Sequence, residues 1–170
     1  PIMLRDSAHI QEADAAYLNQ KSNRRGQPPV LPLYTLADAE ASLKLIRPHD
    51  YNEPLPLPGG VVVTHVDAGH ILGAALALVE IPYNGGDFLR IALVFDLGRR
   101  NLPLLNDPVQ LQDVDVVIAE STYGDRLHDN ALNAREELRE GIVRALGRGG
   151  KVLIPTFALG RAQEIVYHLV

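Results

Sequence analysis

The stretch Val61-Val62-Val63-Thr64-His65-Val66-Asp67-Ala68-Gly69-His70 decides the fold, because a β-branched run stops at a glycine turn and delivers a histidine. Two later apolar runs end in the same way, at Asp96 and at Glu120. In layered α/β folds, polar groups at strand ends reach a shared crevice while the strands stay in the core. The sequence therefore predicts one site formed by His70, Asp96 and Glu120.

The runs around this stretch predict a sheet. Residues 74–83 and 88–95 flank Asn84-Gly85-Gly86-Asp87, which is a strong hairpin signal between two apolar segments. Residues 114–119 read as a further buried strand that leads to Glu120.

The remaining chain predicts helices and one more strand. Residues 4–20 have helical periodicity, and Thr35-Leu36-Ala37-Asp38 resembles a capping box that starts a helix ending before Pro48. Residues 21–32 form an exposed connection. Beyond Glu120 we expect a helix capped by Asp129 or Asn130, a buried strand over 151–155 and a helix from about Ala158, which is the order of a parallel α/β unit.

The composition limits the class of protein. The chain has 170 residues, 46% of them hydrophobic and 22% charged, which is typical of a soluble protein of one domain or slightly more. No cysteine is present, so a metal must be held by His, Asp, Glu and water. The net charge of −5 argues against a broadly basic nucleic-acid surface, although paired arginines allow local positive patches. We expect a cytoplasmic protein without a membrane span or signal peptide. From the residues at both ends, we expect the chain to be a fragment of a longer protein.

Several candidate residues have a structural alternative. The structural alternative for His70 is a hydrogen-bonded residue in a turn, and for Asp96 it is a cap of the Leu97-Gly98 turn. A carboxylate after an apolar run needs hydrogen bonds, water or a cation, and mixed imidazole and carboxylate groups suit zinc. The spacing His65-x-Asp67-x-x-His70 allows a local metal cluster, although a strained one. We interpret His65 as a structural residue. The remaining histidines, which lack ligand spacing, are His9, His49, His128 and His168.

The segment Thr156-Phe157-Ala158-Leu159-Gly160-Arg161-Ala162-Gln163 joins a predicted strand to a helix start, where free backbone N–H groups can bind an anion. It lacks the Gly-Lys-Ser/Thr ending of a phosphate-binding Walker loop, so a plain turn is the simpler interpretation.

Four stretches together carry a resemblance: DSAHIQEADA (6–15), DAGHILGAA (67–75), ESTYGDRLH (120–128) and LIPTFALGRAQE (153–164). Their order and spacing resemble the β-CASP branch of the metallo-β-lactamase superfamily, whose members include RNA-processing nucleases. The resemblance covers nearly the whole chain. It implies an α/β fold in which residues 1–122 are part of an αββα sandwich and residues 123–170 begin an α/β β-CASP domain.

The resemblance also implies roles for the three strand-end residues. His70 resembles a histidine that binds one zinc ion, and Asp96 resembles an aspartate that bridges two zinc ions. Glu120 resembles the acidic residue that supports the site through hydrogen bonds. Phe95 stands where the family usually has a small residue. The family's H-x-H-x-D-H motif, which supplies most zinc ligands, and its later β-CASP histidines are not in this sequence.

The function that the resemblance implies is hydrolysis of RNA phosphodiester bonds at a two-zinc centre in the parent protein, with Asp96 and Glu120 as catalytic residues. Two retained ligands cannot hold a two-metal centre, so we expect the isolated chain to be inactive. It is also expected to self-associate or to pack against missing segments. Two alternatives stay open. One is a DNA-processing β-CASP nuclease or another hydrolase of the same fold, and the other is a catalytically silent scaffold in an RNA-processing complex.

Overall fold

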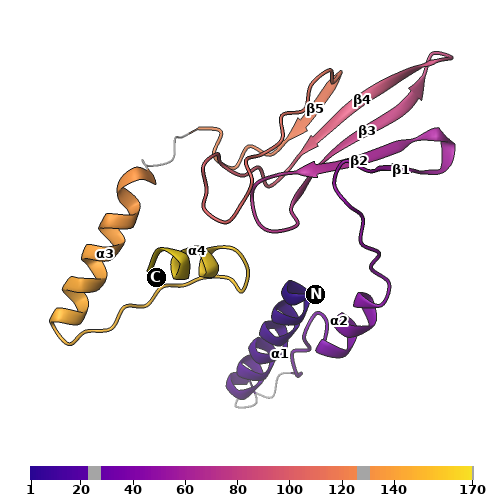
Figure 1. The fold of residues 1–170 in the computed structure, drawn as a ribbon. Helices are drawn as coiled ribbons and strands as arrows, with labels where there is room; N and C mark the ends of the chain where they lie inside the picture. The colour runs from indigo at the N-terminus through magenta and orange to yellow at the C-terminus, as the bar shows by residue number, and fades with distance from the viewer. Residues whose placement is uncertain (23–27, 126–130, 170) are drawn as a thin grey trace. The chain divides into compact units, whose positions relative to one another are not determined.

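The computed structural model describes residues 1–22, 28–125 and 131–169 (Figure 1). Its chain divides into two compact units, Pro1–Pro48 and His49–Val170. The domain boundary expected near Tyr123 concerns the family's domains, and it stays a prediction.

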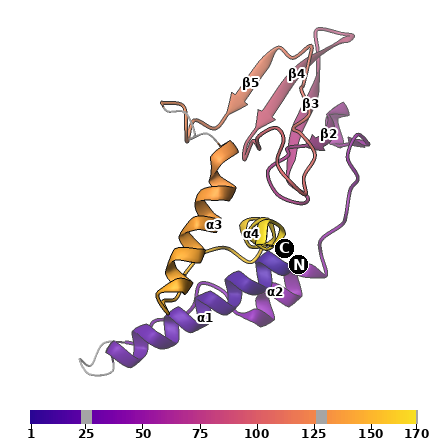
Figure 2. The same cartoon turned by 60° about the vertical axis from the view of Figure 1, so that its left-hand side comes forward.

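The first unit is a pair of helices. Helix α1 covers Ile2–Ser22 and helix α2 covers Leu36–Leu43, and they lie side by side (Figure 2). The contact is made through small side chains, because Ala8 and Ala39 are almost completely buried. Both predicted helices are confirmed, although α2 ends at Leu43 and the chain continues in turns before Pro48.

The start of α2 is the predicted capping box. The Thr35 side chain accepts a hydrogen bond from the Asp38 backbone N–H at 3.2 Å, and the Asp38 carboxylate accepts one from the Thr35 backbone N–H at 2.8 Å. Two backbone donors that have no partner inside the helix are thus satisfied.

The second unit contains, among the described residues, one five-stranded sheet in the order β1-β2-β3-β4-β5. The pairs β1–β2, β2–β3 and β3–β4 are antiparallel, whereas β5 is parallel to β4. The strands are β1 (Pro54–Pro56), β2 (Val62–Asp67), β3 (Ala75–Tyr83), β4 (Asp87–Val94) and β5 (Val116–Ala119), with a short 3-10 turn at Pro58–Gly60. The predicted hairpin is β3–β4, and its turn places Asn84 and Gly85 at φ 47° and 78°, as a tight hairpin turn requires.

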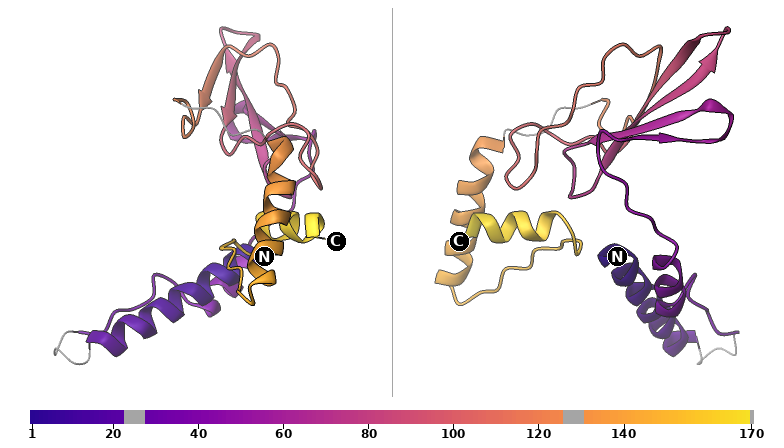
Figure 3. Two further views of the ribbon diagram at one scale, coloured as in Figure 1. Left: turned by 90° about the vertical axis from the view of Figure 1, so that its left-hand side faces the viewer. Right: turned by 45° about the vertical axis from the view of Figure 1, so that its right-hand side comes forward.

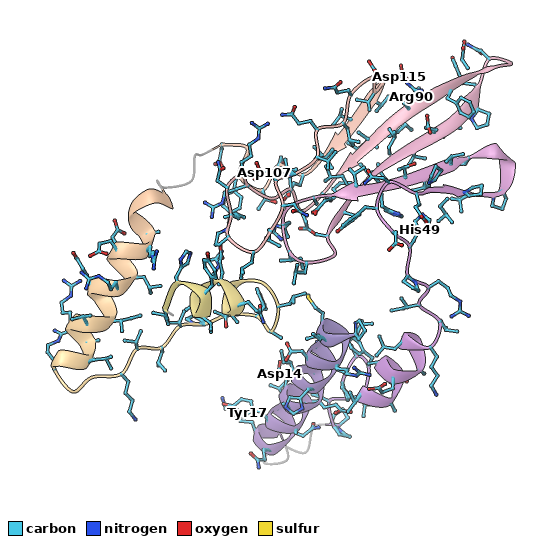
Figure 4. All side chains as sticks on the ribbon, in the orientation of Figure 1. Asp14, Tyr17, His49, Arg90, Asp107 and Asp115 are labelled. Atoms are coloured by element: carbon cyan, nitrogen blue, oxygen red, sulfur yellow. The ribbon has the colours of Figure 1, made fainter. Side chains whose placement is uncertain are left out.

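The parallel pairing of β5 needs a connection that returns along the sheet, and residues 95–115 supply it. At its far end, the Arg90 backbone N–H donates to the Asp115 carboxylate at 2.8 Å, and the Asp115 N–H donates to the Arg90 carbonyl at 2.9 Å. Figure 4 shows these two residues together beside β4 and β5. These bonds set the register in which β5 enters the sheet.

The core of this unit lies under the end of β2. Val66, Ala68 and Leu76 are buried, and Val94 and Leu111 pack against them. Ala68 is completely buried although it lies just past the strand, so the turn that leads to His70 is anchored in the core. No helix within the described ranges is long and apolar enough to cross a membrane.

Helices α3 (Ala131–Gly147) and α4 (Arg161–Leu169) follow the sheet (Figure 3). Both were predicted, and α3 ends as expected, with the Gly150 N–H bonded to the Ala145 carbonyl at 2.9 Å. The helix cap predicted at Asp129 or Asn130 lies outside the described residues.

Two details of the predicted strands are wrong. Residues 151–155 are not a strand, and Leu153 is 90% exposed. The apolar pattern alone does not make a strand when no neighbouring strand pairs with it among the residues that the structure describes. Strand β5 forms, but it is exposed and not buried as predicted, because it lies at the edge of the sheet. The α/β class itself is confirmed.

Candidate active site

The topology brings the C-terminal ends of three strands to the same end of the sheet, which is called the sheet edge in the description of the site. Because β2, β4 and β5 point in the same direction, the segments that follow them leave the sheet on the same side. Those segments carry His70, Asp96 and Glu120, and all three residues are exposed. This is the juxtaposition that the sequence predicts.

Two glycines join the turn before His70 to the segment after Asp96. The Gly98 N–H donates to the Ala68 carbonyl at 2.9 Å. A Cβ atom on Gly98 would lie 1.8 Å from the Gly69 carbonyl oxygen and 2.6 Å from the His70 nitrogen. Only glycine permits this approach, so the backbones at His70 and Asp96 are held together.

Glu120 connects the third strand end to the second. Its backbone N–H donates to the Val94 carbonyl at 3.1 Å, and its Oε1 accepts the Leu97 N–H at 2.9 Å. The other oxygen, Oε2, accepts the Thr122 hydroxyl at 2.8 Å. The carboxylate thus fixes the segment that carries Asp96.

The same contacts favour the charged form of Glu120. The Thr122 hydroxyl, followed by the Leu97 N–H, lowers the pKa of the Glu120 carboxyl, and His70 and the Asp96 N–H contribute in the same direction. Burial acts in the opposite direction and does not prevail. Glu120 is therefore an anion near neutral pH.

Asp96 itself adopts an uncommon backbone conformation, with φ of 48°. Asp and Asn tolerate this left-handed region better than most residues, but it still has a cost that the surroundings must offset. The bond from Leu97 to Glu120 is one such contact. The preceding Phe95 is 48% exposed, so the larger residue at this position requires no space in the core.

The local cluster of His65, Asp67 and His70 does not form a metal site. No group of three or more His, Cys, Asp or Glu side chains in the described part of the chain is arranged to hold a metal ion. The Asp67 carboxylate instead accepts hydrogen bonds from Gly69 and Asn106. The ring of His65 packs edge-on against that of His49 at 5.9 Å between centroids, which agrees with a structural role.

The donor chemistry at the sheet edge fits part of a zinc site. His70 offers an imidazole nitrogen and Asp96 a carboxylate oxygen, which are both ordinary zinc ligands. Two donors are fewer than the three or four that such a site uses. The described residues therefore provide one side of a site, and the roles of His70, Asp96 and Glu120 stay predictions.

The segment before α4 does not present a free anion site. The Gly160 N–H donates to the Gln163 side chain at 2.7 Å, and the Gln163 amide donates back to the Ala158 carbonyl at 3.0 Å. The plain capped turn is thus the better interpretation. One of the arginine pairs that allow a local positive patch, Arg24-Arg25, lies outside the described residues, and so does His128.

Sequence reasoning missed the residues that assemble this edge. Thr122, Gly98 and Asn106 contact the candidate residues or their turns, but each lacks a distinctive motif of its own. The only local signal was Asp67-Ala68-Gly69, because aspartate two residues before a glycine N–H favours a side-chain-capped turn.

Comparison with known proteins finds relatives that are named as ribonucleases. No family model matches the chain. It is 39% identical over 138 residues to ribonuclease TTHA0252 of Thermus thermophilus, an alignment that covers 81% of this chain and 31% of that protein. It is 36% identical over 165 residues to endoribonuclease YSH1 of Gibberella zeae, covering 93% of this chain and 19% of the relative. Cleavage and polyadenylation specificity factor 73 of Drosophila melanogaster is 35% identical over 135 residues, covering 79% and 19%.

Two of these relatives are named as ribonucleases, and the chain belongs to their family, the β-CASP branch of the metallo-β-lactamase superfamily. The chain spans between about a fifth and a third of the length of these relatives.

Proposed function

We propose that this chain is part of a metal-dependent ribonuclease, the parent protein, in which His70 and Asp96 each donate to a two-zinc centre. The observation that carries the proposal is the common sheet edge, at which the turns of His70 and Asp96 are joined through Gly69 and Gly98. The names of the relatives support RNA as the substrate.

The residues of the chain have separate tasks in this proposal. His70 and Asp96 hold metal, and Glu120 keeps the Asp96 segment in place through the Leu97 N–H. Metal ions held there by His70, Asp96 and further ligands would supply Lewis-acid chemistry, namely activation of water and stabilisation of negative charge on the phosphate. Because Glu120 is charged and hydrogen-bonded, it also stabilises positive charge on this side of the site.

The proposal is tested by measuring zinc content and RNA cleavage of the parent protein and of its Asp96→Ala variant. We expect the variant to lose bound zinc and most of its activity, because one ligand of the centre is removed. Asp87→Ala is the matched control, since Asp87 is an exposed carboxylate at the opposite end of β4. Full activity in Asp96→Ala refutes the proposal.

The same assays separate the other candidate functions. Preference for DNA or for a thioester over RNA, measured side by side, assigns a different substrate class. A parent protein that lacks the upstream histidine cluster and binds no zinc is a silent scaffold. The described residues supply only two donors, so the 170-residue chain alone is expected to cleave no RNA.

A further inference from the structure

Asp67, the last residue of β2, lies three positions before His70 and has no role in the reaction proposed above. One carboxylate oxygen, Oδ1, accepts the Gly69 N–H at 2.8 Å. The other, Oδ2, accepts the Asn106 side-chain amide at 3.0 Å. Both oxygens are thus engaged with protein groups, one in the turn that leads to His70 and one in the long connection between β4 and β5.

The backbone makes a second link between the same segments. The Asp67 carbonyl accepts the Val109 N–H at 3.0 Å. Gly69 has φ of 61°, and a Cβ atom there would lie 2.8 Å from the Asn106 carbonyl oxygen and from Pro108. Gly69 is therefore packed against residues 106–108, while its carbonyl faces Gly98.

The surroundings of Asp67 make these hydrogen bonds important. The nearby Tyr51 hydroxyl donates to the Ala74 carbonyl at 2.7 Å. The pKa of Tyr51 is raised, first by burial and then by the charge of Asp67. A carboxylate in a partly dehydrated setting depends on its hydrogen-bond donors more than an exposed one does.

We propose that Asp67 is a positioning residue for His70, and that it acts together with Asn106. The pair fixes the Ala68-Gly69 turn between residues 96–98 and residues 106–109, and so sets where the imidazole stands relative to Asp96. This inference rests on the proposed function, because only there is His70 a metal ligand whose position matters.

The chemistry of the pair allows a sharp test. Asp67→Asn keeps the size of the side chain, but it replaces one acceptor by an NH₂ donor. That donor then faces either the Gly69 N–H, which is also a donor, or Asn106, whose amide must rotate so that its oxygen accepts. In either case the negative charge that strengthens both hydrogen bonds is lost. The exchange Asp67→Asn with Asn106→Asp restores the pairing, since the amide oxygen accepts from Gly69 and the amide nitrogen donates to the new carboxylate.

Three quantities are measured on the full-length parent protein: hydrogen exchange of the Gly69 amide, zinc affinity, and kcat and KM for RNA. We expect Asp67→Asn to speed exchange at Gly69 and to lower zinc affinity or kcat by about 10-fold, with KM unchanged. The double variant Asp67→Asn/Asn106→Asp should recover both the slow hydrogen exchange at Gly69 and the lost zinc affinity or kcat. Asp107→Asn is the matched control, because it removes a charge from the same connection while one oxygen can still accept the Asn101 N–H.

Each outcome decides the matter. The proposal is overturned if Asp67→Asn matches the wild type in hydrogen exchange at Gly69 and in kcat. It is also overturned if the double variant Asp67→Asn/Asn106→Asp recovers neither quantity. If Asp67→Asn does not fold, the milder Asn106→Ala, at an exposed position, must still lower kcat, and an unchanged kcat overturns it. A parent protein that neither cleaves RNA nor loses zinc in Asp96→Ala refutes the proposed function instead, while exchange at Gly69 still tests Asp67.

Discussion

Gly98 shows how much a single residue contributes to the candidate site. An alanine Cβ at this position would overlap the Gly69 carbonyl at 1.8 Å, and that atom is backbone that cannot rotate away. We therefore expect Gly98→Ala to lower the free energy of unfolding of the parent protein by about 1–3 kcal/mol or more, which is the usual cost of overpacking. Chemical denaturation measures this change.

The matched control for that substitution is Gly86→Ala in the β3–β4 turn. A Cβ atom there meets no heavy atom within 4 Å, and the residue has no positive φ. The control should unfold close to the wild type. Equal denaturation midpoints for Gly98→Ala and Gly86→Ala would show that the segment of Gly98 is not held in contact with the turn of Gly69.

Glu120 offers a prediction about pH. Its folded pKa is lowered, chiefly by the Thr122 hydroxyl, whereas a free glutamate titrates at about 4.3. The stability that it contributes is therefore fully present above the unfolded pKa and is lost as the pH falls through the lower folded pKa. Thr122→Val removes the hydroxyl and should raise the pKa of Glu120 towards its ordinary value.

An NMR titration of the Glu120 carboxyl carbon in wild type and Thr122→Val measures that change. Ser121→Ala is the control, since it removes a neighbouring hydroxyl, whereas within the described residues the Glu120 carboxylate accepts its hydrogen bonds from Leu97 and Thr122. The role given to Thr122 fails if the two variants titrate alike.

At the scale of elements, the sequence predicted what depends on neighbours along the chain. The β3–β4 turn and the α2 capping box are set by residues within four positions of each other, so both were predicted and both are present. Residues 151–155 have the same kind of apolar pattern, yet they form no strand. A strand requires a partner, and the choice of partner is not encoded in local pattern.

The positions of the candidate residues in the fold were predictable to the same extent, whereas their roles stay predictions. Strand ends located His70, Asp96 and Glu120, because each follows an apolar run directly or after a short turn. The contacts that hold them were not predictable, since Gly98 and Gly69 are far apart in sequence and either glycine alone indicates only a turn. Likewise, no pattern pairs Asp67 with Asn106, which are separated by 39 positions.

At the scale of the whole molecule, burial sets the last prediction. Among the described residues, the buried apolar side chains are Ala8, Ala15, Ala39, Val66, Ala68, Leu76 and Ala92, most of them small. Large apolar side chains such as Leu31, Leu33 and Phe157 are 78–85% exposed. Because burial of apolar surface contributes roughly 25 cal/mol per Å² to folding and association, so much exposed surface favours contact with other chains.

We therefore expect the 170-residue chain, produced alone, to self-associate as its concentration rises. Sedimentation velocity over a dilution series of about 100-fold measures this, because a self-associating chain sediments faster when concentrated. The full-length parent protein is the control, since its additional residues can cover the same side chains. A chain that stays monomeric throughout the series and unfolds in one sharp transition would show that these exposed side chains do not drive association.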